Sequence, residues 1–108
     1  MIKNKTKNKI LAKKVYFCKG ILSKSIGLMF SKKKSLVFVN EKEKLVPLHM
    51  CFVFYPIDVL FLDKEKKVIE IKKNFKPFTF FNPKHKAKYV IELPYGFKGS
   101  KVGDKIEF

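Results

Sequence analysis

The feature that most constrains this chain is a long apolar run near its middle, HMCFVFYPIDVLFLD, at residues 49–63. A run this apolar is predicted to be buried and to form the core. Pro56 cannot donate a hydrogen bond to a β-ladder, so it predicts a kink, a bulge or a sheet edge at that point. Asp58 is costly to bury unless it is hydrogen-bonded or functional. The run is therefore also the first place to look for a site.

Shorter apolar segments around this run indicate a β-rich fold. The chain has 12 Phe and no Trp, and Phe and β-branched residues suit a pleated, half-buried surface. Helical spacing occurs only over residues 22–30, with Ser23 available as a cap. The fold class predicted is mainly β, α+β at most. We expect a small, strongly bent sheet that closes into a barrel-like single domain with one short helix, because closure removes exposed edges.

The first 14 residues differ in composition from the rest. They carry six Lys and no acidic residue, which predicts a basic, flexible N-terminal tail followed by one β-barrel-like domain over residues 15–108. No apolar segment typical of a signal peptide follows the basic start. The run at residues 51–62 is too short, and too interrupted by Pro56 and Asp58, to span a bilayer. We therefore predict a cytoplasmic protein without a membrane span.

Five ordered sequence blocks resemble a known family. They are GLMF at residues 27–30, LHMCF at 48–52, YPIDVLFLD at 55–63, YVIELPYG at 89–96 and VGDKIEF at 102–108. Together they are similar to the domain-of-unknown-function 192 family (uncharacterised protein family 0127), especially its short archaeal-type members, over residues 19–108. The resemblance implies a compact, mainly β domain whose biochemical role is not established.

The chain departs from that family's pattern at three places. Ser31 stands where the family usually has Arg after the first block, and His49–Val53 replaces the Trp-Met-x-Asn-Thr segment of bacterial members. The usual Gly in the turn after Asp63 is also absent. A role that depends on that Trp or Asn therefore does not transfer to this chain.

A polar cluster at one barrel mouth is the main candidate site. It comprises the ligand-binding candidates His49, Met50, Tyr55, Asp58 and Glu92. Asp58 is either a functional carboxylate facing a pocket or a structural acceptor for backbone N–H groups at the Pro56 kink. Glu92 either joins this cluster or is an outward-facing or ion-paired strand residue. The leading interpretation is a non-catalytic module that binds a small ligand or a protein partner. A weaker alternative is an enzyme that uses Asp58 and His49 as acid and base.

Metal binding is not predicted. Along a strand, Met50 points away from His49 and Cys51, so the three side chains cannot converge without a bulge. No catalytic residue and no cofactor is predicted either, because no nucleophile motif or phosphate loop is present. Cys18 and Cys51 are read as buried free thiols, although a disulfide between facing strands stays open.

The net charge of +16 gives a second functional alternative. All 25 basic residues are Lys, and Lys attracts polyanions but lacks the planar fork with which Arg reads bases. This alternative is a nucleic-acid-associated protein with little sequence specificity. Its candidate residues are Lys32, Lys33, Lys34, Lys72, Lys73, Lys76 and Phe78. The opposing interpretation is that the use of Lys in place of Arg reflects genome composition or a high growth temperature, with surface Lys serving solubility. The two differ in whether the Lys side chains gather on one face.

Overall fold

The computed structural model describes residues 1–13, 15–19, 35–45, 48–49, 57–76, 80–94 and 99–108. These residues form the strands β1 (Ile2–Asn4), β2 (Lys9–Ala12), β3 (Val15–Lys19), β4 (Ser35–Lys44), β5 (Leu48–His49), β6 (Ile57–Leu62), β7 (Val68–Phe75), β8 (Phe80–Phe81), β9 (Ala87–Pro94) and β10 (Ile106–Glu107). The described part contains strands and connections but no helix, so the predicted mainly β class is confirmed. The predicted helix at residues 22–30 lies outside the described residues.

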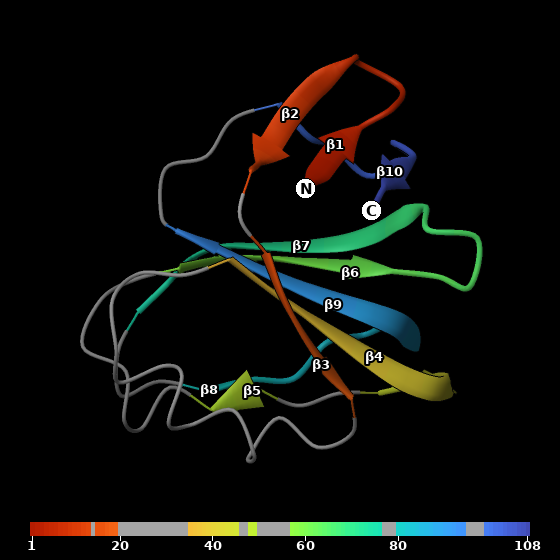
Figure 1. Ribbon diagram of the computed structural model, residues 1–108. Helices are drawn as coiled ribbons and strands as arrows, with labels where there is room; N and C mark the ends of the chain where they lie inside the picture. Colours follow the sequence, from red (N-terminus) through yellow and green to blue (C-terminus); the bar gives the residue numbers. More distant parts are fainter. Residues whose placement is uncertain (14, 20–34, 46–47, 50–56, 77–79, 95–98) are drawn as a thin grey trace.

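A five-stranded sheet in the order β3-β4-β9-β6-β7 forms the centre of the molecule (Figure 1). β3 and β4 run parallel, and the other neighbours are antiparallel. β6 and β7 form an antiparallel hairpin. Its turn is held by Asp63, whose Oδ1 accepts hydrogen bonds from the backbone N–H groups of Glu65 and Lys67 at 2.9 and 3.0 Å.

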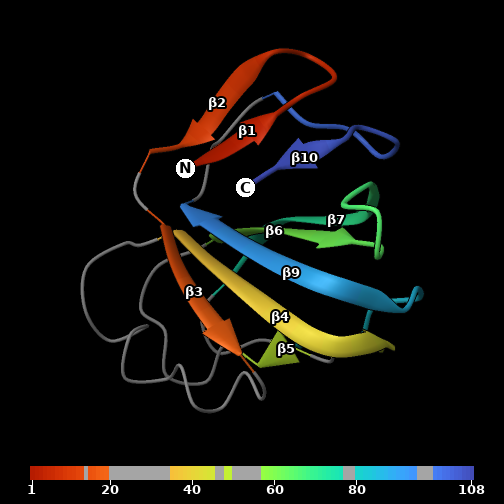
Figure 2. The same cartoon turned by 45° about the vertical axis from the view of Figure 1, so that its right-hand side comes forward.

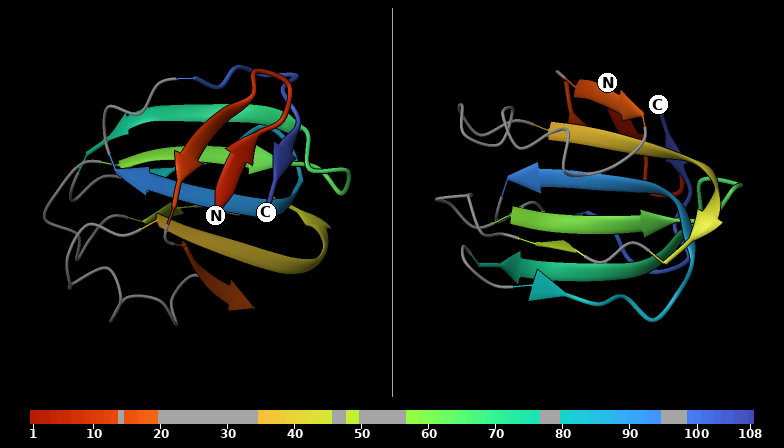
Figure 3. Two further views of the ribbon diagram at one scale, coloured as in Figure 1. Left: turned by 45° about the horizontal axis from the view of Figure 1, so that its top comes forward. Right: turned by 90° about the horizontal axis from the view of Figure 1, so that it is seen from below.

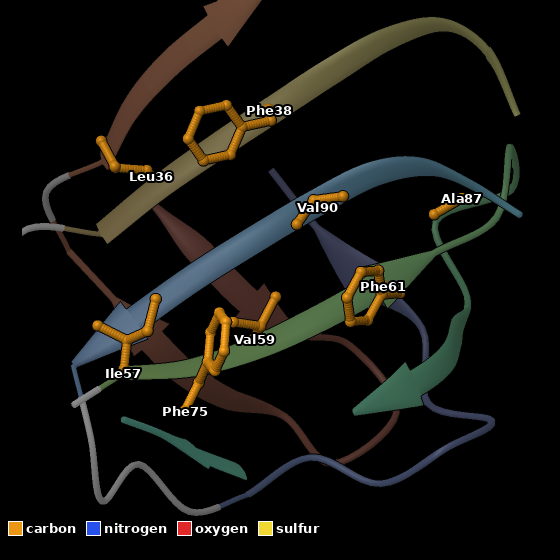
Figure 4. Close-up of a cluster of buried hydrophobic side chains, with 8 residues drawn as sticks. All are labelled: Leu36, Phe38, Ile57, Val59, Phe61, Phe75, Ala87 and Val90. Carbon is orange, nitrogen blue, oxygen red and sulfur yellow. The ribbon is translucent and has the colours of Figure 1, made fainter. Parts of the chain in front are cut away.

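The two faces of this sheet are covered by two different layers. On what we call the first face, a buried cluster packs beneath Phe81 of β8; it contains Leu36, Phe38, Ile57, Val59, Phe61, Phe75, Ala87 and Val90 (Figure 4). The second face carries a separate cluster that includes Ile2 of β1 and Ile106 of β10. Figures 1 and 2 show the sheet β10-β1-β2 on one side of the central sheet and the β5-β8 pair on the other.

This sandwiching explains the apolar run that dominates the sequence. All six residues of β6 are buried, because alternate side chains enter the cluster on each face. A strand covered on both faces gains from apolar residues at every position, not at every second one.

The predicted closure into a barrel is wrong. Among the described strands, β3 and β7 remain the two open edges of the central sheet, and the views in Figure 3 show the sheet curved but not closed. The apolar surface is buried instead by two smaller sheets that lie over the faces. The two smaller sheets thus cover the apolar faces of the central sheet and keep them from water.

The predicted flexible tail over residues 1–14 is also not what the structure contains. β1 and β2 pair with each other, and β1 pairs with β10. Ile2 is fully buried in the second-face cluster, while Lys3 between Ile2 and Asn4 points outward. Lys alternates with buried residues in this segment, which is the side-chain pattern of a β-strand. The high density of positive charge made this pattern hard to recognise in the sequence.

A network of buried polar side chains links this N-terminal sheet to residues 99–104. The Asn4 Nδ2 group donates to Asp104 Oδ2 at 2.8 Å and to the Gly99 carbonyl at 2.6 Å. Desolvation raises the pKa of Asp104, but hydrogen bonds from Asn4, the Lys101 backbone and Lys7 outweigh it and lower that pKa overall. The carboxylate therefore stays ionised and bound to its donors.

No helix in the described part of the chain is long and apolar enough to cross a membrane.

Candidate functional site

Glu92 places a carboxyl group on an apolar surface. In β9 its cross-strand partners are Leu36 of β4 and Val59 of β6, and both belong to the first-face cluster. Because directly paired residues share a face of the sheet, the Glu92 side chain points to the first face as well. Its exposed fraction is 4%. The carboxyl group is therefore almost out of contact with water, yet it lies within three residues of the end of its strand.

This location changes the protonation of Glu92. Desolvation by burial raises the pKa of its carboxyl group from 4.5 to about 8, because the charged form loses its hydration. Among the described residues, no ion pair includes Glu92. At neutral pH the group is predominantly the neutral acid, which donates one hydrogen bond through its O–H and accepts others. A desolvated, uncharged carboxyl group of this kind is typical of binding and catalytic sites.

Asp58 lies on the other face of the sheet. It alternates with Ile57 and Val59 of the first-face cluster, and its cross-strand partner in β9 is Leu93 of the second-face cluster. Asp58 is fully buried, and its Oδ1 accepts a 2.7 Å hydrogen bond from the backbone N–H of Asn74. The structure thus does not bring together Asp58 and Glu92, two members of the predicted polar cluster, because their side chains point to opposite faces.

The Asp58–Asn74 hydrogen bond is located at an irregularity between two strands. The pairing of β6 with β7 shifts register between Ile57 and Val59, and Asn74 has a left-handed backbone with φ of 51°. A register shift leaves backbone groups without their regular partner. Asp58 therefore supplies a side-chain acceptor at this irregularity between β6 and β7. The structural interpretation from the sequence placed its donors at the Pro56 kink, which lies outside the described residues.

Replacing Asp58 with Ala is expected to lower the free energy of unfolding by about 1–3 kcal/mol, because the partly buried N–H of Asn74 loses its acceptor. Chemical denaturation measures this change. Asp58→Asn retains a side-chain oxygen as acceptor and should lose less than Asp58→Ala. Equal stability of Asp58→Ala and the parent protein would show that this bond is not structural.

The remaining ligand-binding candidates are only partly placed. His49 pairs with Phe80 in the β5-β8 sheet, which lies over the first face, since Phe81 contacts Phe61 and Phe75 there. The backbone of His49 therefore lies over the first face, whereas the Asp58 side chain points to the second face. This arrangement gives no support to an acid–base pair formed by the two residues. Met50 and Tyr55 lie outside the described residues, as does Cys51. No three metal-binding side chains gather within the described ranges.

The nucleic-acid candidates are brought partly together at one sheet edge. Lys72 and Lys73 lie on β7, and Lys76 directly follows it. The Lys72 ammonium is 5.4 Å from the centre of the Phe81 ring. Lys32, Lys33, Lys34 and Phe78 lie outside the described residues. Lys84 lies near the same edge, since Glu70 of β7 accepts a hydrogen bond from its backbone N–H at 3.0 Å.

Comparison with known proteins gives sequence relatives and structural neighbours. Residues 2–108 match the family DUF192, described as "Uncharacterized ACR". A UPF0127 protein of Pyrococcus horikoshii is 35% identical, with 100% of this chain and 98% of that protein covered. One of Thermococcus sibiricus is 34% identical over 100% of this chain and 74% of that protein. A protein of unknown function from Novosphingobium aromaticivorans has a similar fold, with a TM-score of 0.75 at 22% identity over 87% of this chain and 74% of that one.

Proposed function

This chain belongs to the DUF192 family, and from that premise we propose that it is a small β domain that binds an uncharged, amide-bearing ligand through the protonated carboxyl group of Glu92. The observation that carries the proposal is the burial of this carboxyl group on an apolar face, which raises its pKa to about 8. An apolar surface with one convergent polar group is typical of small-ligand sites.

The ligand class follows from the hydrogen-bonding capacity of a neutral carboxyl group. Its O–H donates to a carbonyl oxygen, and its own carbonyl oxygen accepts from an N–H. A primary amide presents a carbonyl and an N–H in the complementary order, so the two groups form a pair of hydrogen bonds. Leu36 and Val59, the cross-strand partners of Glu92, are themselves buried, so we expect the hydrocarbon part of such a ligand to be small.

Charged ligands suit this site less well. A cation would be repelled by a chain of net charge +16. An anion would lose its hydration on the first face, and within the described residues no basic side chain is paired with Glu92 there to compensate. An uncharged ligand avoids both costs.

Thermal denaturation with small amides tests the proposal, because acetamide, propionamide and benzamide are uncharged at every pH used. We expect a saturable rise in Tm at about pH 6, when Glu92 is protonated, and little rise at about pH 9.5, when it is ionised. Glu92→Leu should abolish the rise at both pH values. Glu92→Gln should keep a hydrogen-bonding pair and lose the pH dependence.

Two outcomes would contradict the proposal. One is the absence of a saturable rise with any of the three amides at pH 6. The other is a rise of the same size in Glu92→Leu, which would place amide binding away from this carboxyl group.

A further inference from the structure

We propose that this protein has a second binding site, on the second face of the central sheet, at which aromatic rings and neighbouring lysines hold single-stranded nucleic acid by its bases and its phosphates. We call the ring surface the aromatic patch and define it by Phe17, Tyr89 and Phe108. The site is independent of Glu92, whose side chain points to the first face.

The rings of the aromatic patch come from three distant parts of the chain and contact one another. Phe108 follows β10, and Figure 3 shows this end of the chain over β9. Its ring centre is 5.2 Å from that of Tyr89 in β9 and 6.0 Å from that of Phe17 in β3. Phe17 pairs with Val37 of the second-face cluster, so both side chains point to this face. The sequence gave no sign of the patch, because only the folded chain brings these residues together.

Phe17 is open to solvent in this patch. Its exposed fraction is 57%, whereas Phe38 and Phe61 of the same sheet are buried. Tyr89 and Phe108 beside it are half-buried. An aromatic ring that stays in water forgoes the free energy of burial. A solvent-exposed ring that is supported by two others is a surface on which a nucleobase can stack.

Lys66 places a positive charge at the aromatic patch. Its Nζ lies 4.1 Å from the centre of the Phe108 ring and 5.7 Å from that of Tyr89, and it donates a hydrogen bond to the Phe108 carbonyl at 3.2 Å. The backbone of Lys66 is left-handed, with φ of 63°, which is uncommon for a residue with a long side chain. Backbone hydrogen bonds to Asp63 and Ile106 hold it there. The fold thus keeps this lysine in a strained conformation beside the rings.

A cavity of about 450 Å³ adjoins the patch at Lys66. Its lining includes three lysines, two glutamates and a hydroxyl group: Lys5, Lys66, Lys105, Glu65, Glu107 and Thr6. Lys105 forms an ion pair with Glu65 at 3.7 Å. The Thr6 oxygen accepts a hydrogen bond from the Lys105 backbone N–H at 2.8 Å, so its own O–H is left to donate. Because lysines outnumber carboxylates here, the cavity suits a phosphate of a strand whose bases stack on the patch.

The pairing of rings with lysines favours a single strand over a duplex. In a duplex the bases stack on one another, whereas the bases of a single strand are free to stack on protein rings. Stacking accepts every base, and Lys lacks the planar fork with which Arg reads base edges. We therefore expect binding with little sequence preference.

Fluorescence anisotropy with labelled oligo(dT) and oligo(U) of about 12 nucleotides tests the patch. Both should bind more tightly than a duplex of oligo(dT) and oligo(dA). Phe17→Leu removes the ring but keeps an apolar side chain, and it should weaken binding of both single strands about fivefold or more, whereas Phe17→Tyr should bind like the parent protein. Ile10→Ala is the control, because Ile10 is 53% exposed on β2, and it should leave the affinity unchanged. Circular dichroism checks that each variant is folded.

A tryptophan reporter tests stacking directly. The chain has no Trp, so Phe17→Trp introduces a single indole into the aromatic patch. Oligo(dT) should quench its fluorescence saturably, with the same affinity as in the anisotropy experiment, because the indole stacks on a base.

The salt dependence of oligo(dT) binding tests the cavity. Lys5→Gln combined with Lys105→Gln should make the log–log salt slope shallower by about 1.4 units, since each phosphate contact of a single strand contributes about 0.7. Lys84→Gln combined with Lys86→Gln removes the same charge from exposed lysines in the connection between β8 and β9. This control should leave the slope nearly unchanged.

Three results would overturn this inference. Binding of the duplex as tightly as the single strands would mean that net charge alone attracts nucleic acid. Full affinity of Phe17→Leu would show that no base stacks on this ring. Failure of the folded parent protein to bind either single strand at low salt would exclude the site. None of these results depends on whether Glu92 binds an amide.

Discussion

Replacing Glu92 with Gln is expected to stabilise this protein by about 3 kcal/mol at pH 7, a large gain for a single substitution. Burial raises the pKa of the Glu92 carboxyl group to about 8 from 4.5. At pH 7 the unfolded chain carries this group ionised in water, whereas the folded protein must hold it protonated. Each unit of pH between the two pKa values costs about 1.4 kcal/mol of stability. Gln is nearly isosteric with the protonated acid and avoids this cost.

The same reasoning gives the pH dependence. Because the folded-state pKa lies above that of the unfolded chain, the contribution of Glu92 to stability is full below about pH 4.5 and is lost as pH rises through about 8. The total loss over this window is about 5 kcal/mol. Urea denaturation of the parent protein and Glu92→Gln from about pH 5 to about pH 9 should therefore give two curves that diverge as pH rises. Parallel curves would mean that Glu92 ionises normally.

Replacing Ile2 with Ala is expected to cost about 2–5 kcal/mol, as expected for a fully buried Ile. Ile2 is completely enclosed in the second-face cluster, so its truncation leaves a cavity between the two layers. Deletion of residues 1–12 should be worse, because it also removes Asn4 and its hydrogen bonds to Asp104 and Gly99. Chemical denaturation of full-length variants measures the first effect.

Ile10 provides a matched control for that experiment. It is the same residue type in the neighbouring strand β2, but 53% of it is exposed. Ile10→Ala should therefore change the free energy of unfolding by less than about 0.5 kcal/mol. If Ile2→Ala is as mild as Ile10→Ala, the N-terminal strands do not cover the core as described.

The strands of the central sheet were predictable because their segments are rich in apolar, aromatic and β-branched residues. The short apolar segments at residues 15–18, 36–39, 68–71 and 89–93 correspond to β3, β4, β7 and β9. The N-terminal strands were missed, because Lys3, Lys5, Lys7 and Lys9 suggested a solvated tail. Charge density predicts solvent exposure, but it does not distinguish a tail from a strand with one exposed face.

The layer arrangement could not be deduced from residue patterns. Barrel closure and coverage by smaller sheets both protect the apolar faces of a sheet, and the choice depends on pairings such as β1 with β10, which join opposite ends of the chain. Such long-range pairings leave no local signal. The hydrogen bonds of Glu70 to Lys84 and His85 could not be predicted for the same reason, because these residues lie more than a dozen positions away in the sequence.

Two buried acidic residues could be recognised from the sequence. Asp58 and Glu92 stand out there as acidic residues within apolar segments, and both are buried in the structure. Their separation was not foreseen, because it requires the register of β6 against β9, in which Val59 and not Asp58 lies opposite Glu92. A shift of one residue would have placed both carboxyl groups on one face.

The most direct test of this account is an NMR titration of the Glu92 carboxyl carbon in the protein without ligand. The resonance is assigned by its absence from the spectrum of Glu92→Gln, and its chemical shift is followed from about pH 4 to about pH 10. A single inflection near pH 8 is the result expected for a desolvated acid that stays neutral at pH 7. An inflection near 4.5, the ordinary value for Glu, would mean that the group is ionised at neutral pH and would contradict the proposed binding chemistry.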